Sequence, residues 1–231
     1  MKLSIVTGTV NRSWALKRLV SSIFEHAQKN LEWELIIADA SETPTIIKHD
    51  RIRILHEWPR IGHAAGYNKA FKQAKGEYVC WLNDDVVVKP SWDLHAIRFM
   101  EENPWCGLGA IYYSEQGCCY HINHYPYPEM PYANFGIIKR ILGEQIGWFD
   151  EFCRMYGADN SIAFKTILAG YGVAGCIGSK VDHLSVMDDI KRENVRGQPE
   201  DAKHLMMHYQ PLVDEMRAAC RNFPVSPRVL H

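Results

Sequence analysis

Residues 77–86 read EYVCWLNDDV, and this stretch carries the strongest fold signal in the chain. Its residues 78–82 are apolar, as expected of a buried strand, and the run then ends in Asn83, Asp84 and Asp85. Carboxylates at the end of a strand suit Mg²⁺ or Mn²⁺, which take hard oxygen ligands and leave positions open for nucleotide phosphates. An Asn-Asp-Asp sequence also suits a plain turn, since these side chains hydrogen-bond their own backbone. The segment alone leaves both interpretations open.

A second acid, Asp39, closes another apolar run at residues 34–38. Further strands are expected at residues 2–7 and 51–55, with helices over residues 13–24 and 64–74 between them. This alternation predicts a parallel sheet, in which ligands bind beyond the carboxyl ends of the strands. Thr7, Asp39 and Asp85 would all lie at that edge.

The second half of the chain is less regular. We expect a helix at residues 92–102, a strand at 107–113, a surface loop at 120–132, a strand at 135–140, a turn at 147–151, a helix at 159–169, a strand at 173–177 and a helix at 199–222 docked on the same domain. The basic residues Lys191, Arg192 and Arg196 would either close over a diphosphate or form a charged surface loop.

Composition excludes several classes of protein. A chain of 231 residues is large enough for one α/β domain with its own core. Its 26 basic and 27 acidic residues give no electrostatic footprint for nucleic acid or an anionic membrane. Seven cysteines without paired spacing, and no stretch long enough to span a bilayer, favour a cytoplasmic protein with at most peripheral contact at the inner face of a membrane.

The order of six segments resembles the inverting family 2 glycosyltransferases of GT-A fold. The segments are residues 4–12, 35–41, 62–68, 76–86, 146–151 and 157–171. Asn83, Asp84 and Asp85 are similar to the Asn-x-Asp form of the metal motif in rhamnosyltransferase-like members. The resemblance implies a GT-A-like single domain with a Rossmann-like, mostly parallel sheet flanked by helices. Residues 1–86 would be its nucleotide-binding half, residues 87–185 its acceptor half, and residues 186–231 a C-terminal loop and helix packed on the same domain.

The resemblance also implies site residues. Those of the donor pocket would be Thr7, Arg12, Asp39, Asn68, Asn83 and Asp84. Asp39 would contact the nucleobase or ribose, and Asn68 would face the donor nucleoside. Asp85 would ligate Mn²⁺ or Mg²⁺ bridging the diphosphate, and His183 matches a position that supplies another ligand in some members.

Asp159 matches the general base of the family, which removes a proton from the acceptor hydroxyl. At the start of a helix it could instead cap the backbone, worth roughly 0.5 to 2 kcal/mol. The chain departs from the family at Ala158 and Ser161, where acids are usual, at Trp148, where glycine is usual, and at Arg60 and Lys165.

The implied function is metal-dependent, inverting transfer of a hexosyl or deoxyhexosyl group from a nucleotide diphosphate sugar to a glycan, lipid-linked or protein-linked acceptor. Surface polysaccharide or glycan synthesis is the expected setting. Two alternatives remain open from the sequence: a sugar nucleotidyltransferase, and a nucleotide-sugar binding module without catalysis. Asp150 and Glu151 could line the acceptor site or form an exposed acidic turn.

Overall fold

The computed structural model describes residues 1–113 and 131–222. Its elements are β1 (Leu3–Thr9), α1 (Ser13–His26), β2 (Trp33–Asp39), β3 (Ile52–His56), α2 (His63–Phe71), β4 (Tyr78–Asn83), β5 (Val86–Val88), α3 (Trp92–Glu102), β6 (Cys106–Tyr113), β7 (Gly136–Lys139), α4 (Arg140–Ile146), α5 (Ala158–Leu168), β8 (Gly172–His183) and α6 (Asp189–Asn222). The loop expected at residues 120–132 lies outside the described residues, except for its last two.

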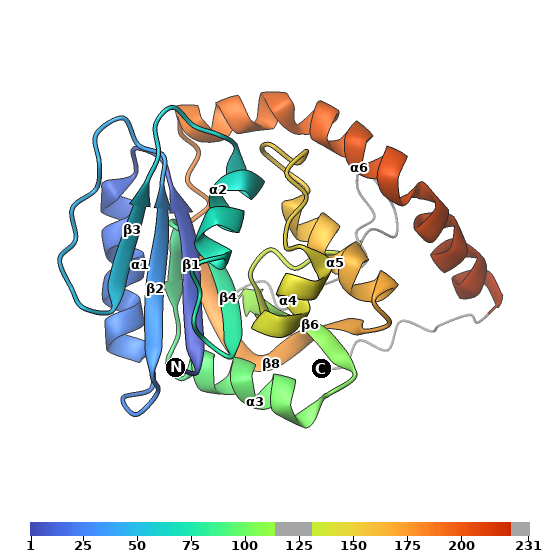
Figure 1. The fold of residues 1–231 in the computed structure, drawn as a ribbon, viewed down its shortest axis with the longest axis horizontal. Coiled ribbons are helices and arrows are strands. Elements are labelled where there is room, and N and C mark those ends of the chain that lie inside the picture. The colour runs from blue at the N-terminus through green and yellow to red at the C-terminus, as the bar shows by residue number, and fades with distance from the viewer. Residues whose placement is uncertain (114–130, 223–231) are drawn as a thin grey trace.

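One sheet runs through the molecule, in the order β3-β2-β1-β4-β7-β6-β8-β5 (Figure 1). The four N-terminal strands are parallel to one another, and their carboxyl ends lie level. Thr9 pairs with Asp39, and Gly8 pairs with Asn83. This confirms the predicted α/β fold with a parallel core, and it places Asp39 and Asp85 at the same edge of the sheet.

The other half of the sheet is mixed. Strand β7 is antiparallel to β4 and β6, whereas β8 is parallel to β6. The short strand β5, which the sequence did not predict, follows the acid pair and lies antiparallel to β8. In this register Val86 pairs with His183. The pairing therefore carries His183 from a distant part of the chain to the end of β4.

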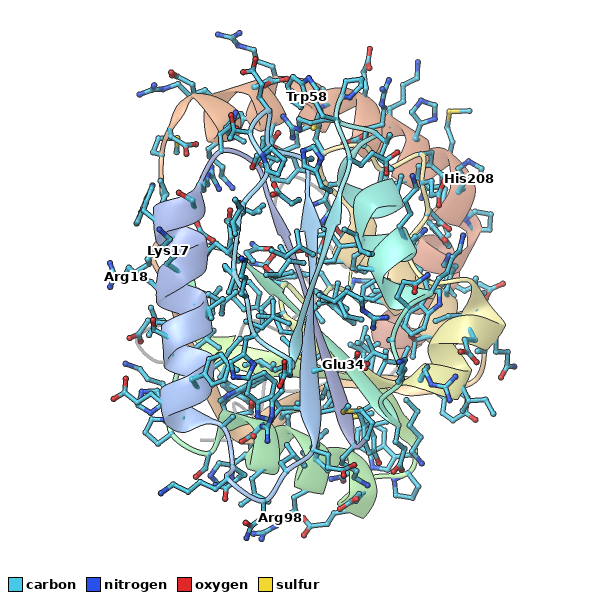
Figure 2. All side chains as sticks on the ribbon, turned by 60° about the vertical axis from the view of Figure 1, so that its left-hand side comes forward. Lys17, Arg18, Glu34, Trp58, Arg98 and His208 are labelled. Atoms are coloured by element: carbon cyan, nitrogen blue, oxygen red, sulfur yellow. The ribbon has the colours of Figure 1, made fainter. Side chains whose placement is uncertain are left out.

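Helices cover both faces of the parallel strands. Figure 2 shows α1 on one side and α2 on the other, with Lys17 and Arg18 projecting from α1 away from the sheet. The inner face of α1 buries Leu16, Leu19 and Ile23 completely. This division of apolar and charged residues is the amphipathic pattern expected of a helix packed on a sheet.

Helix α6 begins earlier than expected. We predicted a loop up to residue 198, but the helix starts at Asp189 and continues through Pro199 and Pro211. Asp188 caps it, since its carboxylate accepts a hydrogen bond from the Lys191 amide at 2.9 Å. A proline inside a helix removes one backbone hydrogen bond, so contacts with the domain must hold this segment helical. The buried side chains of Leu205 and Tyr209 supply such contacts.

Two further boundaries were wrong. Strand β7 ends at Lys139 and a helix, α4, follows at once, where we expected the strand to run on and a turn to come after it. Strand β8 extends to His183, well past residue 177, where we ended it. Both segments lack a clear local period, so their structure depends on packing within the mixed half of the sheet.

Candidate functional site

A cavity of about 340 Å³ lies at the carboxyl ends of the parallel strands. Its walls come from the ends of β1, β2 and β4, the start of α2, the segment before α5 and the first turns of α6. Figure 1 shows α6 arching over this end of the sheet. Six of the residues predicted from the sequence as donor or metal contacts line the cavity: Arg12, Asp39, Asn83, Asp84, Asp85 and His183. Asp159 lines it as well.

Asp84 is held by its neighbours in the cavity wall. Its carboxylate accepts a 2.8 Å hydrogen bond from Thr9 Oγ1 and lies 3.5 Å from Arg12 Nη1. Burial raises the pKa of Asp84 to about 6, although the contacts with Thr9 and Arg12 act in the opposite direction. These contacts engage both of its oxygens, so Asp84 positions Arg12 and the end of β1.

Asp85 faces His183 instead. Its Oδ1 atom lies 3.2 Å from His183 Nε2, and its Oδ2 atom accepts a hydrogen bond from the Val186 amide at 3.3 Å. Burial alone would raise the pKa of Asp85, but hydrogen bonding and charge from His183 bring it below its usual value. Both residues line the cavity, and their contact brings one carboxylate oxygen and one imidazole nitrogen together there.

Asp39 is almost fully buried at the end of β2. Its two carboxylate oxygens accept hydrogen bonds from the amides of Ser41 at 2.9 Å and Thr45 at 2.6 Å. The side chain thereby fixes the loop that follows β2 and still forms part of the cavity wall. His56 lies beside it in the register, and its Nε2 atom is 2.9 Å from the Ser41 carbonyl oxygen.

Two predicted donor contacts lie away from the cavity. Thr7 is completely buried within β1, because this strand continues to Thr9 and not only to residue 7. Asn68 binds the turn after α4: its amide nitrogen donates to the Phe149 carbonyl at 2.9 Å, and its Oδ1 atom accepts from the Phe149 amide at 3.1 Å. Asn68 therefore holds this turn against α2.

Arg12 connects Asp84 to α6. Its Nε and Nη2 atoms donate to the two oxygens of Asp188 at 2.6 and 2.5 Å, a bidentate ion pair. Asp188 is also the residue that caps α6. A single guanidinium thus bridges Asp84 on the sheet and the first turn of the covering helix.

Asp159 is the second residue of α5, on the opposite wall from the parallel strands. Gly157, which precedes the helix, has no side chain to cap it, and the Asp159 carboxylate accepts hydrogen bonds from the backbone amides of Asn160 and of Asp159 itself. Burial raises its pKa, although two backbone amides act in the other direction. The carboxylate thus lines the cavity while it binds the start of α5, and a carboxylate in that position suits a general base.

Asp150 and Glu151 do not line the cavity. Asp150 forms an ion pair with Lys165 at 2.6 Å and accepts a hydrogen bond from the Tyr209 hydroxyl of α6. Lys165, one of the departures from the family pattern, therefore has a structural partner. Glu151 is exposed and accepts a hydrogen bond from Asn68.

Several lining residues were missed by the sequence analysis. They are aromatic and include His63, Tyr67, Trp81 and Tyr156. The Lys191 ammonium lies 5.1 Å from the centre of the Tyr156 ring. Of the three basic residues considered in the C-terminal segment, only Lys191 reaches the cavity, whereas Arg192 and Arg196 are exposed.

Comparisons with known sequences agree with one another. The family model described as Glycosyl transferase family 2 matches residues 4–159. An uncharacterized glycosyltransferase of Rickettsia felis is 35% identical over 109 residues, which are 44% of this chain and 18% of the relative. The provisionally named colanic acid biosynthesis glycosyl transferase WcaA of Escherichia coli is 27% identical over 62% of this chain and 55% of its own. The chain thus matches less than a fifth of the length of the first relative and about half of the length of the second.

Solved structures share the fold. Staphylococcus aureus TarS 1–349 in complex with UDP-GlcNAc has a TM-score of 0.62 and 16% identity, covering 82% of this chain and 60% of that one. Mannosyltransferase PcManGT from Pyrobaculum calidifontis, in complex with GDP-Man and Mn²⁺, has a TM-score of 0.63 and 16% identity, covering 98% and 76%.

Proposed function

Because the chain belongs to glycosyl transferase family 2, we propose that it transfers a sugar from a nucleotide diphosphate sugar to an acceptor hydroxyl group. One observation carries the proposal. Asp39, Asp85, Asp159 and His183 come from four separated parts of the sequence and line a single cavity. A donor molecule with a base, a diphosphate and a sugar offers three different chemical groups to such a cavity.

The nucleoside would bind at the end of the cavity formed by Asp39 and His56. The ordered loop after β2, held by the Asp39 carboxylate, gives that end a fixed shape. The diphosphate would lie near Asp85 and under Lys191, a cation that already lines the cavity. The complexes of similar folds with UDP-GlcNAc and GDP-Man support this class of donor.

The side chains of Asp85 and His183 suit Mn²⁺ or Mg²⁺ bound together with the diphosphate. Among residues 1–113 and 131–222, no group of three or more histidine, cysteine or acidic side chains could hold a metal alone. Asp85 and His183 supply two donors, and divalent cations in nucleotide sites commonly complete their coordination with phosphate and water oxygens. When bound there, the cation would offset the negative charge that develops on the departing nucleotide.

Asp159 would act as the general base. The acceptor oxygen forms a bond to the anomeric carbon while its proton passes to an Asp159 carboxylate oxygen. The bond from the anomeric carbon to the diphosphate breaks, and its electron pair leaves with the nucleotide. Attack from the face opposite the diphosphate inverts the anomeric configuration, and no covalent sugar intermediate forms. The partial burial of Asp159, which raises its pKa, makes it a stronger base once ionised.

We further propose a hexosyl or deoxyhexosyl donor and a role in surface polysaccharide or glycan synthesis. The Asn83-Asp84-Asp85 motif supports a rhamnosyltransferase-like branch, and the similarity to WcaA supports polysaccharide synthesis. A glycan, lipid-linked or protein-linked acceptor would approach from the side of Asp159. In the described part of the chain, no helix has both the length and the hydropathy needed to cross a bilayer. A cytoplasmic enzyme with peripheral membrane contact fits this proposal.

The test is a donor assay that needs no acceptor. Protein is incubated with UDP-, GDP- and dTDP-sugars, with and without Mn²⁺, and release of nucleoside diphosphate is followed together with the anomeric configuration of the freed sugar by NMR. We expect slow hydrolysis of one donor class, faster with Mn²⁺ and with inversion. Formation of pyrophosphate from a nucleoside triphosphate and a sugar phosphate would instead establish a nucleotidyltransferase. Donor binding with neither hydrolysis nor transfer would establish a binding module.

A further inference from the structure

His63 occupies a position in the cavity that the proposed function has not used. It is the first residue of α2, lies partly buried in the cavity wall, and its ring stands 4.5 Å from that of Tyr67 and 6.2 Å from that of Phe149, nearly parallel to the latter. Within the described part of the chain, neither ring nitrogen has a hydrogen-bond partner. The polar edge of a packed imidazole is therefore left for a ligand.

The backbone fixes this ring in place. The His63 amide donates to the Arg154 carbonyl at 2.7 Å, in the segment that leads to Asp159. The preceding Gly62 has φ of +110°, a conformation that favours glycine and that turns the chain into α2. Behind the ring, the Tyr67 hydroxyl donates to the Leu82 carbonyl at 2.8 Å. His63 is thus held between the end of β4 and the segment that carries the proposed base.

The imidazole is neutral at pH 7. Burial lowers the pKa of His63 to about 4, the positive charge of Arg60 acts in the same direction, and Asp201 opposes them weakly. A neutral imidazole presents one hydrogen-bond donor and one acceptor. That combination matches a hydroxyl group, which likewise donates one hydrogen bond and accepts others. A neutral imidazole offers no positive charge to a phosphate group.

The surroundings of His63 also suit a sugar ring. Tyr156 lines the same cavity and is partly exposed there, and the nearly buried rings of Trp81 and Phe149 also form part of its wall. Binding sites of this kind commonly combine aromatic walls with a few polar groups that fix orientation. The nucleoside end, at Asp39 and His56, lies at the ends of β2 and β3 instead.

We propose that His63 determines sugar specificity by hydrogen-bonding a hydroxyl group of the sugar being transferred. This inference rests on the proposed function. It separates the cavity into a nucleoside end at Asp39, a diphosphate region at Asp85, and a sugar region between His63 and Asp159. Loss of one such hydrogen bond in a buried site lowers affinity by roughly ten- to a hundredfold.

The experiment compares binding of two matched probe pairs by calorimetry in the presence of Mn²⁺: UDP with UDP-GlcNAc, and GDP with GDP-mannose. For the pair that the wild type binds, His63→Phe keeps the ring packing but removes both polar atoms. We expect affinity for the nucleotide sugar to fall by roughly ten- to a hundredfold, with affinity for the nucleotide unchanged. His63→Gln, which keeps a neutral donor and acceptor, should recover part of the loss.

His56→Phe is the matched control at the other end of the cavity, and it should weaken both members of the pair equally. If His63→Phe leaves the ratio of the two dissociation constants as in the wild type, the assignment of His63 is overturned while the proposed function stands. If the wild type binds none of the four probes, and none of the other donors of the hydrolysis assay, the proposed function itself fails. The two failures are therefore distinguishable.

Discussion

The Nε2 atom of His183 lies 3.2 Å from the Oδ1 atom of Asp85. No local sequence pattern joins these residues. The antiparallel pairing of β5 with β8 sets Val86 opposite His183 and so brings the imidazole to the preceding carboxylate. The strand pairing fixes the backbone positions of both residues, since a slip of one residue in register would turn His183 to the other face of the sheet.

Asp85→Ala and His183→Ala should each weaken metal-dependent nucleotide binding. Asp85→Ala removes the only fully charged donor of the pair, so we expect the enhancement of UDP or GDP binding by Mn²⁺ to disappear. His183→Ala should reduce this enhancement by about tenfold, in the range seen when one side chain that supports a metal site is lost. Titration calorimetry with and without Mn²⁺ measures both effects.

Asp182→Ala is the matched control for this pair. Asp182 is next to His183 in β8, but its carboxylate pairs with Lys89. An unchanged Mn²⁺ effect in Asp182→Ala, with loss in the other two variants, is the expected pattern. Equal behaviour of all three variants would argue against a metal at Asp85.

Asp159→Asn should preserve donor binding and remove turnover. Asparagine keeps the size of the side chain and cannot accept a proton, so kcat should fall by about 10²- to 10⁴-fold. The wild-type rate should rise with pH as Asp159 ionises, and because burial raises this pKa, the rise should come above the usual range for aspartate. Near-normal turnover of Asp159→Asn, or the same acidic limb in its pH profile, would contradict the assignment.

The sequence predicted those parts of the site that depend on regular parallel strands. Asp39 and Asp85 end two strands of one parallel sheet, so their convergence followed from the alternating pattern of elements. Thr7 lies inside β1 and not at its end, because strand ends are poorly marked in a sequence: β1 runs to Thr9, and Thr9 is the residue that contacts Asp84. The contact of Asn68 with the turn at Phe149 could not be predicted, because that turn is distant in sequence.

The cover of the site could not be predicted from local patterns. Residues 186–198 contain many charges and Gly197, and Pro199 follows, a composition that favours a loop. Their helical state depends on Asp188 as a cap and on ion pairs with side chains from other parts of the chain, such as Arg12 and Arg60. Such contacts are tertiary, so propensity alone gives the wrong answer.

Asp188→Ala should loosen the first turns of α6 over the cavity. The variant loses a helix cap, worth roughly 0.5 to 2 kcal/mol, together with the bidentate partner of Arg12. We expect faster hydrogen exchange at residues 190–195 and weaker nucleotide binding, since Lys191 lies in this turn. Hydrogen exchange with mass spectrometry measures the first effect and calorimetry the second.

Asp189→Ala provides the comparison for that variant. Asp189 is the adjacent residue, strongly exposed, and pairs with the exposed Arg192 within the same helix. Its replacement should change exchange and binding little, because exposed ion pairs contribute roughly 0 to 1 kcal/mol. If Asp188→Ala behaves like Asp189→Ala, the Arg12–Asp188 pair does not hold α6 in place.

Asp201→Ala should destabilise the domain more than any surface substitution on α6. The Asp201 carboxylate is nearly fully buried and accepts hydrogen bonds from the amides of Arg154, Met155 and Tyr156 at 3.0, 2.7 and 2.8 Å. Removing it leaves these amides without their acceptor, at a cost of about 2 to 4 kcal/mol in the free energy of unfolding. Urea denaturation measures the loss.

Glu200→Ala serves as the reference, since Glu200 is exposed on the same turn of α6. Its replacement should change stability by less than about 0.5 kcal/mol. Asp201→Asn should lie between the two, because an amide oxygen still accepts hydrogen bonds but without charge. A loss in Asp201→Ala no greater than in Glu200→Ala would show that α6 does not support the segment before α5.

The pH dependence of stability should report the neutral state of His63. Its pKa is about 4 in the folded protein against 6.5 for an unperturbed histidine, so between these values the unfolded chain binds more protons. The contribution of His63 to the free energy of unfolding should therefore be fully present above pH 6.5. It should fall as pH decreases toward 4, by up to about 3 kcal/mol. His63→Phe cannot take up this proton, so the difference in stability between His63→Phe and the wild type should shift in favour of the variant as pH falls.

The exposed His204, replaced by Phe in the same way, is the control and should give a difference in stability that varies little with pH. Urea denaturation at half-unit steps from pH 4.5 to 7.5 measures all three proteins, and a flat difference for His63→Phe would mean that His63 is protonated as readily when folded as when unfolded.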